Sequence, residues 1–259
     1  MKRLIAILLT CLMALSLFLP ILAQSSSHHW YIRHKESGSI PEIDITVEKL
    51  LSDCDGYYVD RYSHNSQDKV IYLTFDAGYE NGNVAKILDI LHKEEVKGGF
   101  FVLSHLIKSN PELLKRMANE GHLVCNHTAT HKDPTNMTCT ELEKELVDLA
   151  TLYEQTTENK MAPYFRPPQG HFNRETLETA QKMGYKTVFW SLAYADWDEQ
   201  KAPSDEKAKE LLKRRTHNGA VILLHPTSAI NVRILPEMIR YWKNEGYRFG
   251  SLDELTDKD

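Results

Sequence analysis

A set of acidic and basic residues in this sequence has the types needed for acid–base hydrolysis of an amide: Asp76, His127, His131, Arg166, Asp196 and His225. A carboxylate can take a proton from an attacking water, and a histidine can protonate the departing amine. We therefore predict that Asp76 is the general base and that His225 is the general acid. Asp196 is expected to orient His225 and keep it protonated. Arg166 is expected to hold Asp76 and to lower its pKa.

His127 and His131 are four residues apart in the segment NHTATH. On one helical turn both imidazoles would project from the same face, about 6 Å apart at their roots. Two nitrogens at that spacing can lie about 2.0–2.1 Å from one zinc ion. Histidines that only cap or line a helix show the same spacing, but the neighbouring Asp76 favours a metal site. Catalytic zinc usually has three protein ligands, so Asp76 is a candidate for a ligand as well as for the base.

The segment FRPPQG and the aromatic residues near Asp196 supply the candidates for substrate binding. Its two prolines cannot donate hydrogen bonds and stiffen the loop. The backbone N–H of Gln169 or Gly170 is then expected to face a developing oxyanion. Tyr194 and Trp197 flank Asp196, and their aromatic faces suit a sugar ring.

Each candidate follows a predicted strand. The aromatic and β-branched run 70–75 breaks at Gly78, so Asp76 lies at the carboxyl end of a buried parallel strand. Six further strands are expected, at 98–103, 122–126, 164–166, 186–190, 220–224 and 248–250. Helices are expected between consecutive strands, at 84–95, 111–120, 140–157, 174–183, 205–215 and 234–245. This alternation predicts an α/β barrel or doubly wound sheet, in which the carboxyl ends of the strands gather the site.

Composition places few other constraints on function. The chain has 259 residues, of which 42 % are hydrophobic and 26 % are charged, as in ordinary soluble proteins. Its formal net charge of −5 gives no indication of a nucleic-acid binder. Residues 68–256 are expected to form one catalytic domain, and residues 24–67 an arm that packs on it, with a short helix near 46–52. A monomer is favoured.

The amino terminus has the layout of a secretory signal over residues 1–23. Lys2 and Arg3 precede an uncharged apolar run from Leu4 to Leu19, and a polar stretch follows Ala23. The run is short for a membrane-spanning helix. We expect export to the cell wall or medium, with an uncleaved membrane anchor as the alternative.

Five segments in order, TFDAGYENG, NHTATH, FRPPQG, FWSLAYADW and VILLHP, resemble the motifs of the NodB-type polysaccharide deacetylases, carbohydrate esterase family 4. The resemblance covers about residues 70–255 and is nearest to the branch that makes muramic δ-lactam in spore cortex peptidoglycan. It implies a distorted (β/α)7 barrel, a divalent metal such as zinc held by His127 and His131, and the same roles for Asp76, Arg166, Asp196 and His225.

The sequence departs from the family pattern in places. Ala77 replaces the aspartate that usually provides the third metal ligand, which implies a weakly held metal, with water or Asp76 as further ligands. The lactam-forming branch is known for that loss. Gln169 stands where those relatives tend to have arginine, and the usual proline after His131 is displaced to Pro134.

The resemblance implies an exported enzyme that removes the acetyl group of muramic acid in peptidoglycan strands stripped of peptide, with lactam closure to follow. One alternative is a deacetylase of N-acetylglucosamine in peptidoglycan or chitin-like polymers. Another is a glycan-binding protein whose catalysis decayed when position 77 lost its carboxylate. The retained Asp76 and His225 argue against decay, because a binding protein needs neither an acid nor a base.

Overall fold

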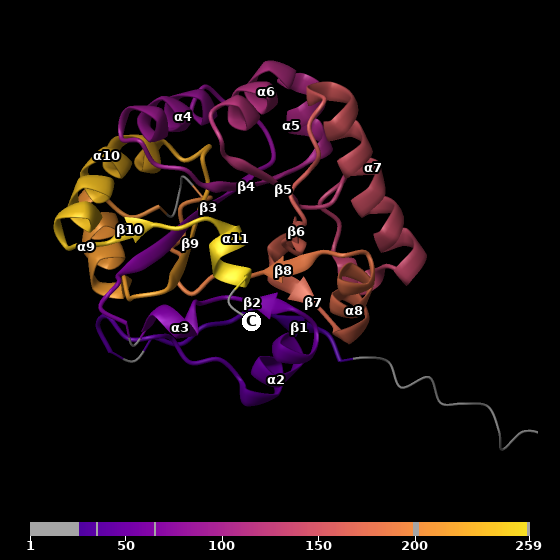
Figure 1. The fold of residues 1–259 in the computed structure, drawn as a ribbon, viewed down its shortest axis with the longest axis horizontal. Helices are drawn as coiled ribbons and strands as arrows, with labels where there is room; N and C mark the ends of the chain where they lie inside the picture. Colours follow the sequence, from indigo (N-terminus) through magenta and orange to yellow (C-terminus); the bar gives the residue numbers. More distant parts are fainter. Residues whose placement is uncertain (1–25, 35, 65, 199–201, 258–259) are drawn as a thin grey trace, which may run out of the picture.

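The computed structural model describes residues 26–257 except 35, 65 and 199–201. The predicted signal peptide at residues 1–23 therefore lies outside the described residues. Parallel strands form a curled sheet, and helices surround it (Figure 1). The expected (β/α)7 barrel type is confirmed, and the structure has strands at all seven predicted positions.

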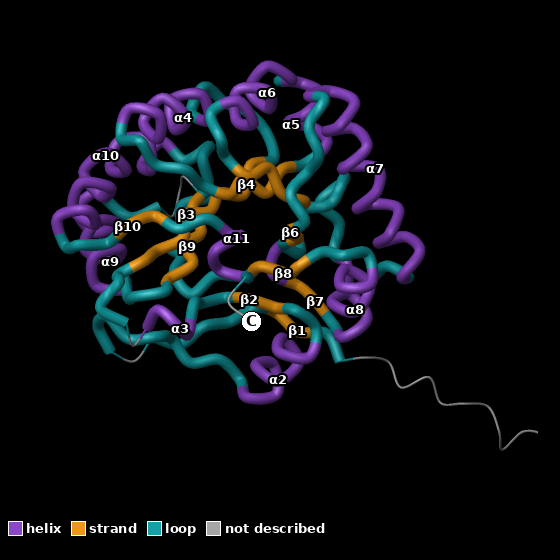
Figure 2. The backbone as a smooth tube through the Cα atoms, in the orientation of Figure 1, coloured by secondary structure: helices purple, strands orange, loops and turns teal. Residues whose placement is uncertain are grey.

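Strand β3 (Val70–Ala77) is the centre of the sheet. It pairs in parallel with β4 (Gly99–Val102), β9 (Ala220–Leu224) and β10 (Arg248–Phe249). From β4 the sheet continues, always in parallel, through the following strands: β5 (Leu123–Asn126), β6 (Tyr164–Phe165), β8 (Lys186–Val188) and β2 (Gly56–Tyr57). A single parallel bridge between Leu192 and Ile222 brings the chain after β8 back to β9. The strands thus curl into a distorted barrel (Figure 2).

Helices cover the outside of the sheet, and their apolar faces explain why they pack there. Those near predicted positions are α2 (Ile45–Asp53), α4 (Val84–Lys93), α6 (Pro111–Asn119), α7 (Cys139–Thr157), α8 (Arg174–Lys182), α9 (Asp205–Arg215) and α10 (Ala229–Asn244). The largest apolar cluster joins alternate residues of β3, such as Leu73 and Phe75, to α4, α6, α9 and α10. The other residues of β3, Val70 and Tyr72, face the barrel interior.

Helix α11 (Leu252–Thr256) lies across the middle of the ring in Figure 1. Leu252 and Leu255 pack with Val70, Tyr72 and residues of the other strands in the interior cluster. The sequence analysis did not predict α11, nor the short helices α3 (Arg61–His64) and α5 (Ser104–Ser109). Because β10 pairs with the first residues of β3 and α11 packs against Val70 and Tyr72, α11 covers the end of the barrel where the strands begin, and leaves the other end for the site.

The segment predicted as an arm contributes to the fold itself. Its strand β2 extends the main sheet beside β8, and β1 (His28–His29) pairs antiparallel with β7 (His171–Phe172). Trp30 stacks on Phe189 with ring centroids 4.4 Å apart. Within the described part of the chain, no helix has both the length and the apolar character required to cross a bilayer.

Candidate functional site

A cavity of about 850 Å³ lies where the strands end, and most of the predicted site residues line it. These are Asp76, His127, His131, Gln169, Tyr194, Trp197 and His225. Arg166 and Asp196 are buried, and each is bonded to one of the lining residues. The barrel therefore brings together groups from five loops, as the order of strands and polar residues predicted.

Asp76 lies at the end of β3 and is held by Arg166. The Arg166 side chain is 0 % exposed, and its Nη1 donates to Asp76 Oδ1 over 2.7 Å. Its other donors reach Thr74 Oγ1 and the carbonyls of Val188 and Phe189, so its orientation is fixed. Burial alone would raise the pKa of Asp76, but the charge of Arg166, with smaller effects of nearby histidines, outweighs it and lowers the pKa. Asp76 is thus a carboxylate that remains ionised although little of it is exposed.

His225 follows β9 and is oriented by Asp196. The two are joined by a 2.7 Å hydrogen bond between His225 Nδ1 and Asp196 Oδ1, and the backbone N–H of His225 donates to Asp196 Oδ2. Burial lowers the pKa of His225, but the hydrogen bond and charge of Asp196 outweigh this effect, so the pKa is raised. With Nδ1 used by Asp196, Nε2 is the nitrogen available to the cavity.

Asn231, in the first turn of α10, was missed by the sequence analysis. Its Nδ2 donates to Asp196 Oδ2 over 2.6 Å and to the His225 carbonyl over 3.0 Å. Tyr194, predicted to bind substrate, lines the cavity but is largely buried, and its hydroxyl donates to Asn231 Oδ1 over 2.5 Å. The sequence does contain a sign of this role: Asn231 is the one amide side chain among the otherwise apolar residues buried along this helix.

His127 and His131 lie close together, but not on a helix as predicted. Both belong to the loop after β5, where Thr128 and His131 have positive φ values of 67° and 59°. The ring centroids are 5.0 Å apart. The loop is fixed by Asn126, which accepts from the N–H of Thr128, and by Glu145, which accepts from Thr130. The two histidines are thus brought together by a loop with two residues in the left-handed conformation, and not by the spacing of a helical turn.

His127 and Asp76 each direct a hydrogen-bond acceptor, Nε2 and Oδ2 respectively, toward the other. His127 Nδ1 is 2.7 Å from the Arg166 carbonyl, which can only accept, so Nδ1 carries the proton. Burial, chiefly, lowers the pKa of His127 to about 4 and keeps the ring neutral. Its Nε2 therefore presents a lone pair toward Asp76 Oδ2, 3.6 Å away. Two acceptors at this distance with no proton between them are the environment that a cation fits.

A metal ion fits these residues only as a sparsely ligated site. Burial also lowers the pKa of His131, so both imidazoles are neutral donors suited to zinc. Among the described residues, no group of three His, Cys, Asp or Glu side chains is placed to hold an ion. Ala77 is fully buried and belongs to the apolar cluster outside the sheet, so it provides no ligand.

One of the two predicted oxyanion donors is already used. The N–H of Gly170 donates to the Pro167 carbonyl over 3.0 Å, which corrects its assignment as a free donor. Gln169 lies in the same tight turn with a φ of 58° and lines the cavity, so it remains a candidate. Trp197 is 65 % exposed, and its ring centroid is 5.9 Å from that of His225. An exposed indole beside His225 suits a sugar face better than core packing.

The cavity wall contains further residues that the sequence analysis did not assign. His171 lines it and contacts Asp133, with His171 Nδ1 2.9 Å from Asp133 Oδ2. Asp133 also caps the turn that begins at the displaced Pro134, which explains the local sequence KDP. His34 and Arg215 complete another part of the wall. These contacts join segments far apart in the chain, so no local pattern could reveal them.

Comparison with known proteins agrees with the geometry. Residues 63–188 match the family described as polysaccharide deacetylase. The chain is 36 % identical over 227 residues to the peptidoglycan-N-acetylmuramic acid deacetylase PdaA of Bacillus subtilis, covering 88 % of this chain and 85 % of PdaA. It is 31 % identical over 197 residues to a peptidoglycan-N-acetylglucosamine deacetylase of Bacillus cereus, and the match covers 73 % of this chain and 89 % of that enzyme. The solved structure of PdaA, described as a family 4 carbohydrate esterase, superposes with a TM-score of 0.84 over 90 % of this chain and 98 % of its own, at 35 % identity.

Proposed function

Since the chain belongs to the polysaccharide deacetylases of carbohydrate esterase family 4, we propose that it hydrolyses the N-acetyl group of muramic acid in peptide-stripped peptidoglycan strands. The observation that carries this proposal is the pair of oppositely tuned groups in one cavity: Asp76 with a lowered pKa and His225 with a raised one. Such pairs mark the base and the acid of a hydrolytic site.

The roles follow from these protonation states. Asp76 takes a proton from water as the water oxygen bonds to the acetyl carbonyl carbon. The N–H of Gln169, one of the two alternatives first expected, faces the developing oxyanion. His225, protonated and oriented by Asp196, gives a proton to the amide nitrogen as the C–N bond breaks. Acetate and the free amine of the sugar are the products. Arg166 holds Asp76 in place and keeps it ionised until it takes the proton from water.

His127 and His131 are the residues that would hold a divalent metal, with Asp76 or water as further ligands. When bound, a zinc ion would polarise the acetyl carbonyl and acidify a water. The missing carboxylate at Ala77 predicts that this ion is weakly held. A chelator should therefore remove the metal under mild conditions. Titration calorimetry of the metal-free protein with zinc can measure the affinity.

The similarity to PdaA, which covers 88 % of this chain, supports this choice of substrate, because the name of PdaA describes it as an N-acetylmuramic acid deacetylase. Trp197 provides the platform for a sugar ring beside His225. The amine freed by the reaction can attack the lactyl carboxyl of the same sugar, which closes a δ-lactam with loss of water. Action on strands implies export, for which residues 1–23 are the signal, with residues 24–67 and 68–256 remaining as arm and catalytic domain of a monomer.

A second candidate is removal of acetyl from N-acetylglucosamine, favoured by the similarity to the Bacillus cereus enzyme of that name. Mass spectrometry of peptide-stripped strands incubated with the protein, with and without zinc, separates the two. Loss of acetyl mass from muramic acid supports the proposal, and a further loss of water supports lactam closure on this chain. Deacetylation of glucosamine or of chitin oligomers alone would replace it with the second candidate. Glycan binding without any acetate release would favour a decayed binding protein.

A further inference from the structure

Besides His171, which contacts Asp133, the wall of the cavity contains two more basic side chains, those of His34 and Arg215, that the proposed hydrolysis does not use. His34 comes from the amino-terminal segment, and Arg215 from the last residue of α9. The chain segments that carry them are in contact, because the N–H of Gly38 donates to the carbonyl of Arg214. Ile32 and Ala193 line the same cavity. His34 and Arg215 therefore form a second polar region of the cavity, outside the set of acid, base and metal ligands.

The guanidinium of Arg215 has no acidic partner among the residues that the structure describes. Its Nη1 donates to the Ala193 carbonyl over 3.0 Å, which orients the group, and no carboxylate of the described residues pairs with it. Burial lowers the pKa of Arg215, and the neighbouring charge of Arg214 lowers it further. By contrast, Arg166 in the same site pairs with Asp76. A half-buried guanidinium with unused donors and no counter-charge is suited to an anionic ligand, above all a planar carboxylate.

His34 has the same incomplete environment. Both of its ring nitrogens are buried, and neither has a hydrogen-bond partner within the part of the chain that the structure describes. Burial, with the charges of Arg215 and Arg214, lowers the pKa of His34 to about 4, so the ring is neutral near pH 7. A neutral imidazole still has one N–H to donate. Buried polar atoms are normally satisfied, and since His34 lines the cavity, a turn of its ring would bring one of these unpartnered nitrogens to a ligand there.

We infer that His34 and Arg215 form an anion subsite that binds a carboxylate carried by the sugar substrate. The inference rests on the proposed function, because muramic acid differs from glucosamine by a lactyl ether that ends in a carboxylate. In strands still bearing peptide this carboxylate is an amide, which a guanidinium binds less well. The subsite would thus provide, in two named residues, a physical basis for the preference for peptide-stripped strands that the proposed function assumes.

The test compares two substrates that differ only in this charge. Peptide-stripped strands carry the free muramoyl carboxylate, and the same strands coupled to methylamine carry a neutral amide. The wild-type protein should have a kcat/KM at least about tenfold higher on the free carboxylate. Arg215→Gln should remove this preference by lowering only the value for the free carboxylate. Arg215→Lys should retain part of it, and His34→Gln should weaken it by a smaller factor.

Arg214→Gln is the matched control, because it removes the same charge from an exposed neighbour that does not line the cavity. It should leave both values unchanged. An equal loss on both substrates in Arg215→Gln would mean that Arg215 only supports the loop at Ala193, and this would overturn the inference. Equal kcat/KM values of the wild-type protein on the free carboxylate and on the methylamide would also overturn it.

Failure of the proposed function would look different. In that case wild-type protein would release no acetate from muramic acid on either strand. The subsite is then tested by binding alone, with N-acetylmuramic acid and its methylamide in saturation-transfer NMR. Selective binding of the acid that Arg215→Gln abolishes would support the subsite without the reaction. Equal binding of acid and amide would overturn it.

Discussion

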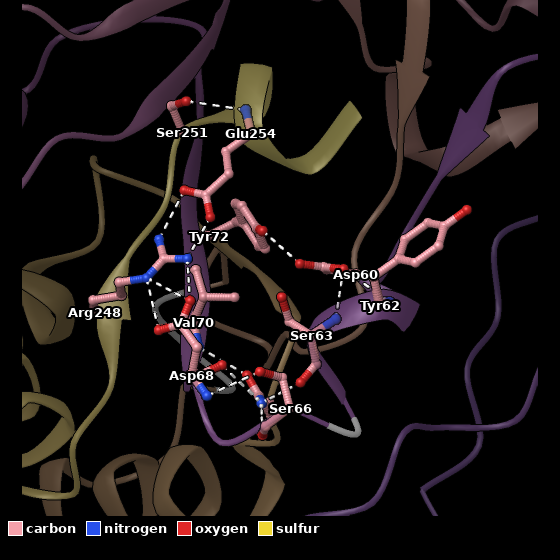
Figure 3. Close-up of polar contacts among 11 residues, drawn as sticks. Asp60, Tyr62, Ser63, Ser66, Asp68, Val70, Tyr72, Arg248, Ser251 and Glu254 are labelled. Atoms are coloured by element: carbon pink, nitrogen blue, oxygen red, sulfur yellow. Dashed lines mark hydrogen bonds and ion pairs between the residues drawn. The ribbon is translucent and has the colours of Figure 1, made fainter. Parts of the chain in front are cut away.

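The two ends of strand β3 use similar residues for opposite purposes. At the amino end, Arg248 lies between Asp68 and Glu254, and the hydroxyl of Tyr72 points to Asp60 (Figure 3). At the carboxyl end, Asp76 faces a cavity with His127 and His225. The first set of charges is neutralised by its own neighbours, whereas the second leaves donors and acceptors directed at a ligand. Barrel proteins commonly separate stability and chemistry in this way.

The amino end is a closed network. Asp60 is 2 % exposed and accepts from Tyr72 Oη over 2.7 Å and from the N–H groups of Tyr62 and Ser63 over 3.0 Å each. Asn218 accepts from the N–H of Val70 over 2.8 Å. These bonds fasten the loop before β3 to the strand. Substitutions here are therefore expected to alter the free energy of unfolding and to leave the rate of acetate release by each folded molecule unchanged.

The largest effect is expected from Asp76→Asn at the carboxyl end. Removal of the base should lower kcat by about a thousandfold. Asparagine keeps an oxygen for Arg166, so the chain should remain folded, which circular dichroism can check. The measurement is acetate release from peptide-stripped strands. Appreciable turnover in a folded variant would remove Asp76 from the mechanism.

His225→Ala should have the next largest effect. Without a positioned acid, kcat is expected to fall by about a hundredfold on the same strands. Removal of His225 also leaves the buried Asp196 without this partner, so thermal stability should fall and kcat is compared on folded protein. A full rate in this variant would show that water or another group protonates the amine.

Asp196→Asn should change the pH dependence as well as the rate. The reaction needs protonated His225, so activity is present below its raised pKa and is lost as pH rises through that value. Asparagine lacks the charge that raises this pKa. The alkaline limb of kcat/KM should therefore move to lower pH, as measured over a pH series. An unmoved limb would mean that another group controls it.

At the amino end, Asp60→Ala should destabilise without affecting catalysis. The loss leaves the buried hydroxyl of Tyr72 and two backbone N–H groups without this acceptor, at a cost of about 2–3 kcal/mol in the free energy of unfolding. Tyr72→Phe is the matched control and should cost about 1 kcal/mol. Urea unfolding gives both values. A fall in kcat in either folded variant would break the proposed separation of the two ends.

The smallest effect is expected from Arg248→Met. Its side chain is 42 % exposed, so its ion pairs with Asp68 and Glu254 are screened by water. The expected loss is less than about 1 kcal/mol and should decrease further in high salt. Urea unfolding at low and high salt measures it. A salt-independent loss would indicate that packing of the side chain stem, rather than charge, stabilises this end.

The sequence was informative wherever the signal is local. The apolar run ending at Asp76 predicted both the strand and the position of its carboxylate. The alternation of strands and helices predicted a barrel or a doubly wound sheet, and the family resemblance implied the barrel. The loop from His127 to His131 was mispredicted as a helix, because its left-handed residues carry no glycine to mark them. The hydrogen bond from Tyr194 to Asn231 was not predicted, because the two residues lie 37 positions apart in the sequence. The region formed by His34 and Arg215 depends on packing between distant segments, which periodicity does not report.

The most direct test measures acetate release and the free energy of unfolding on the same preparations of Asp76→Asn and Asp60→Ala. Asp76→Asn should lose about a thousandfold in rate yet stay folded, and Asp60→Ala should lose stability while each folded molecule keeps the wild-type rate. Acetate release by Asp76→Asn at the wild-type rate would contradict the central claim that the chemistry takes place where strand β3 ends.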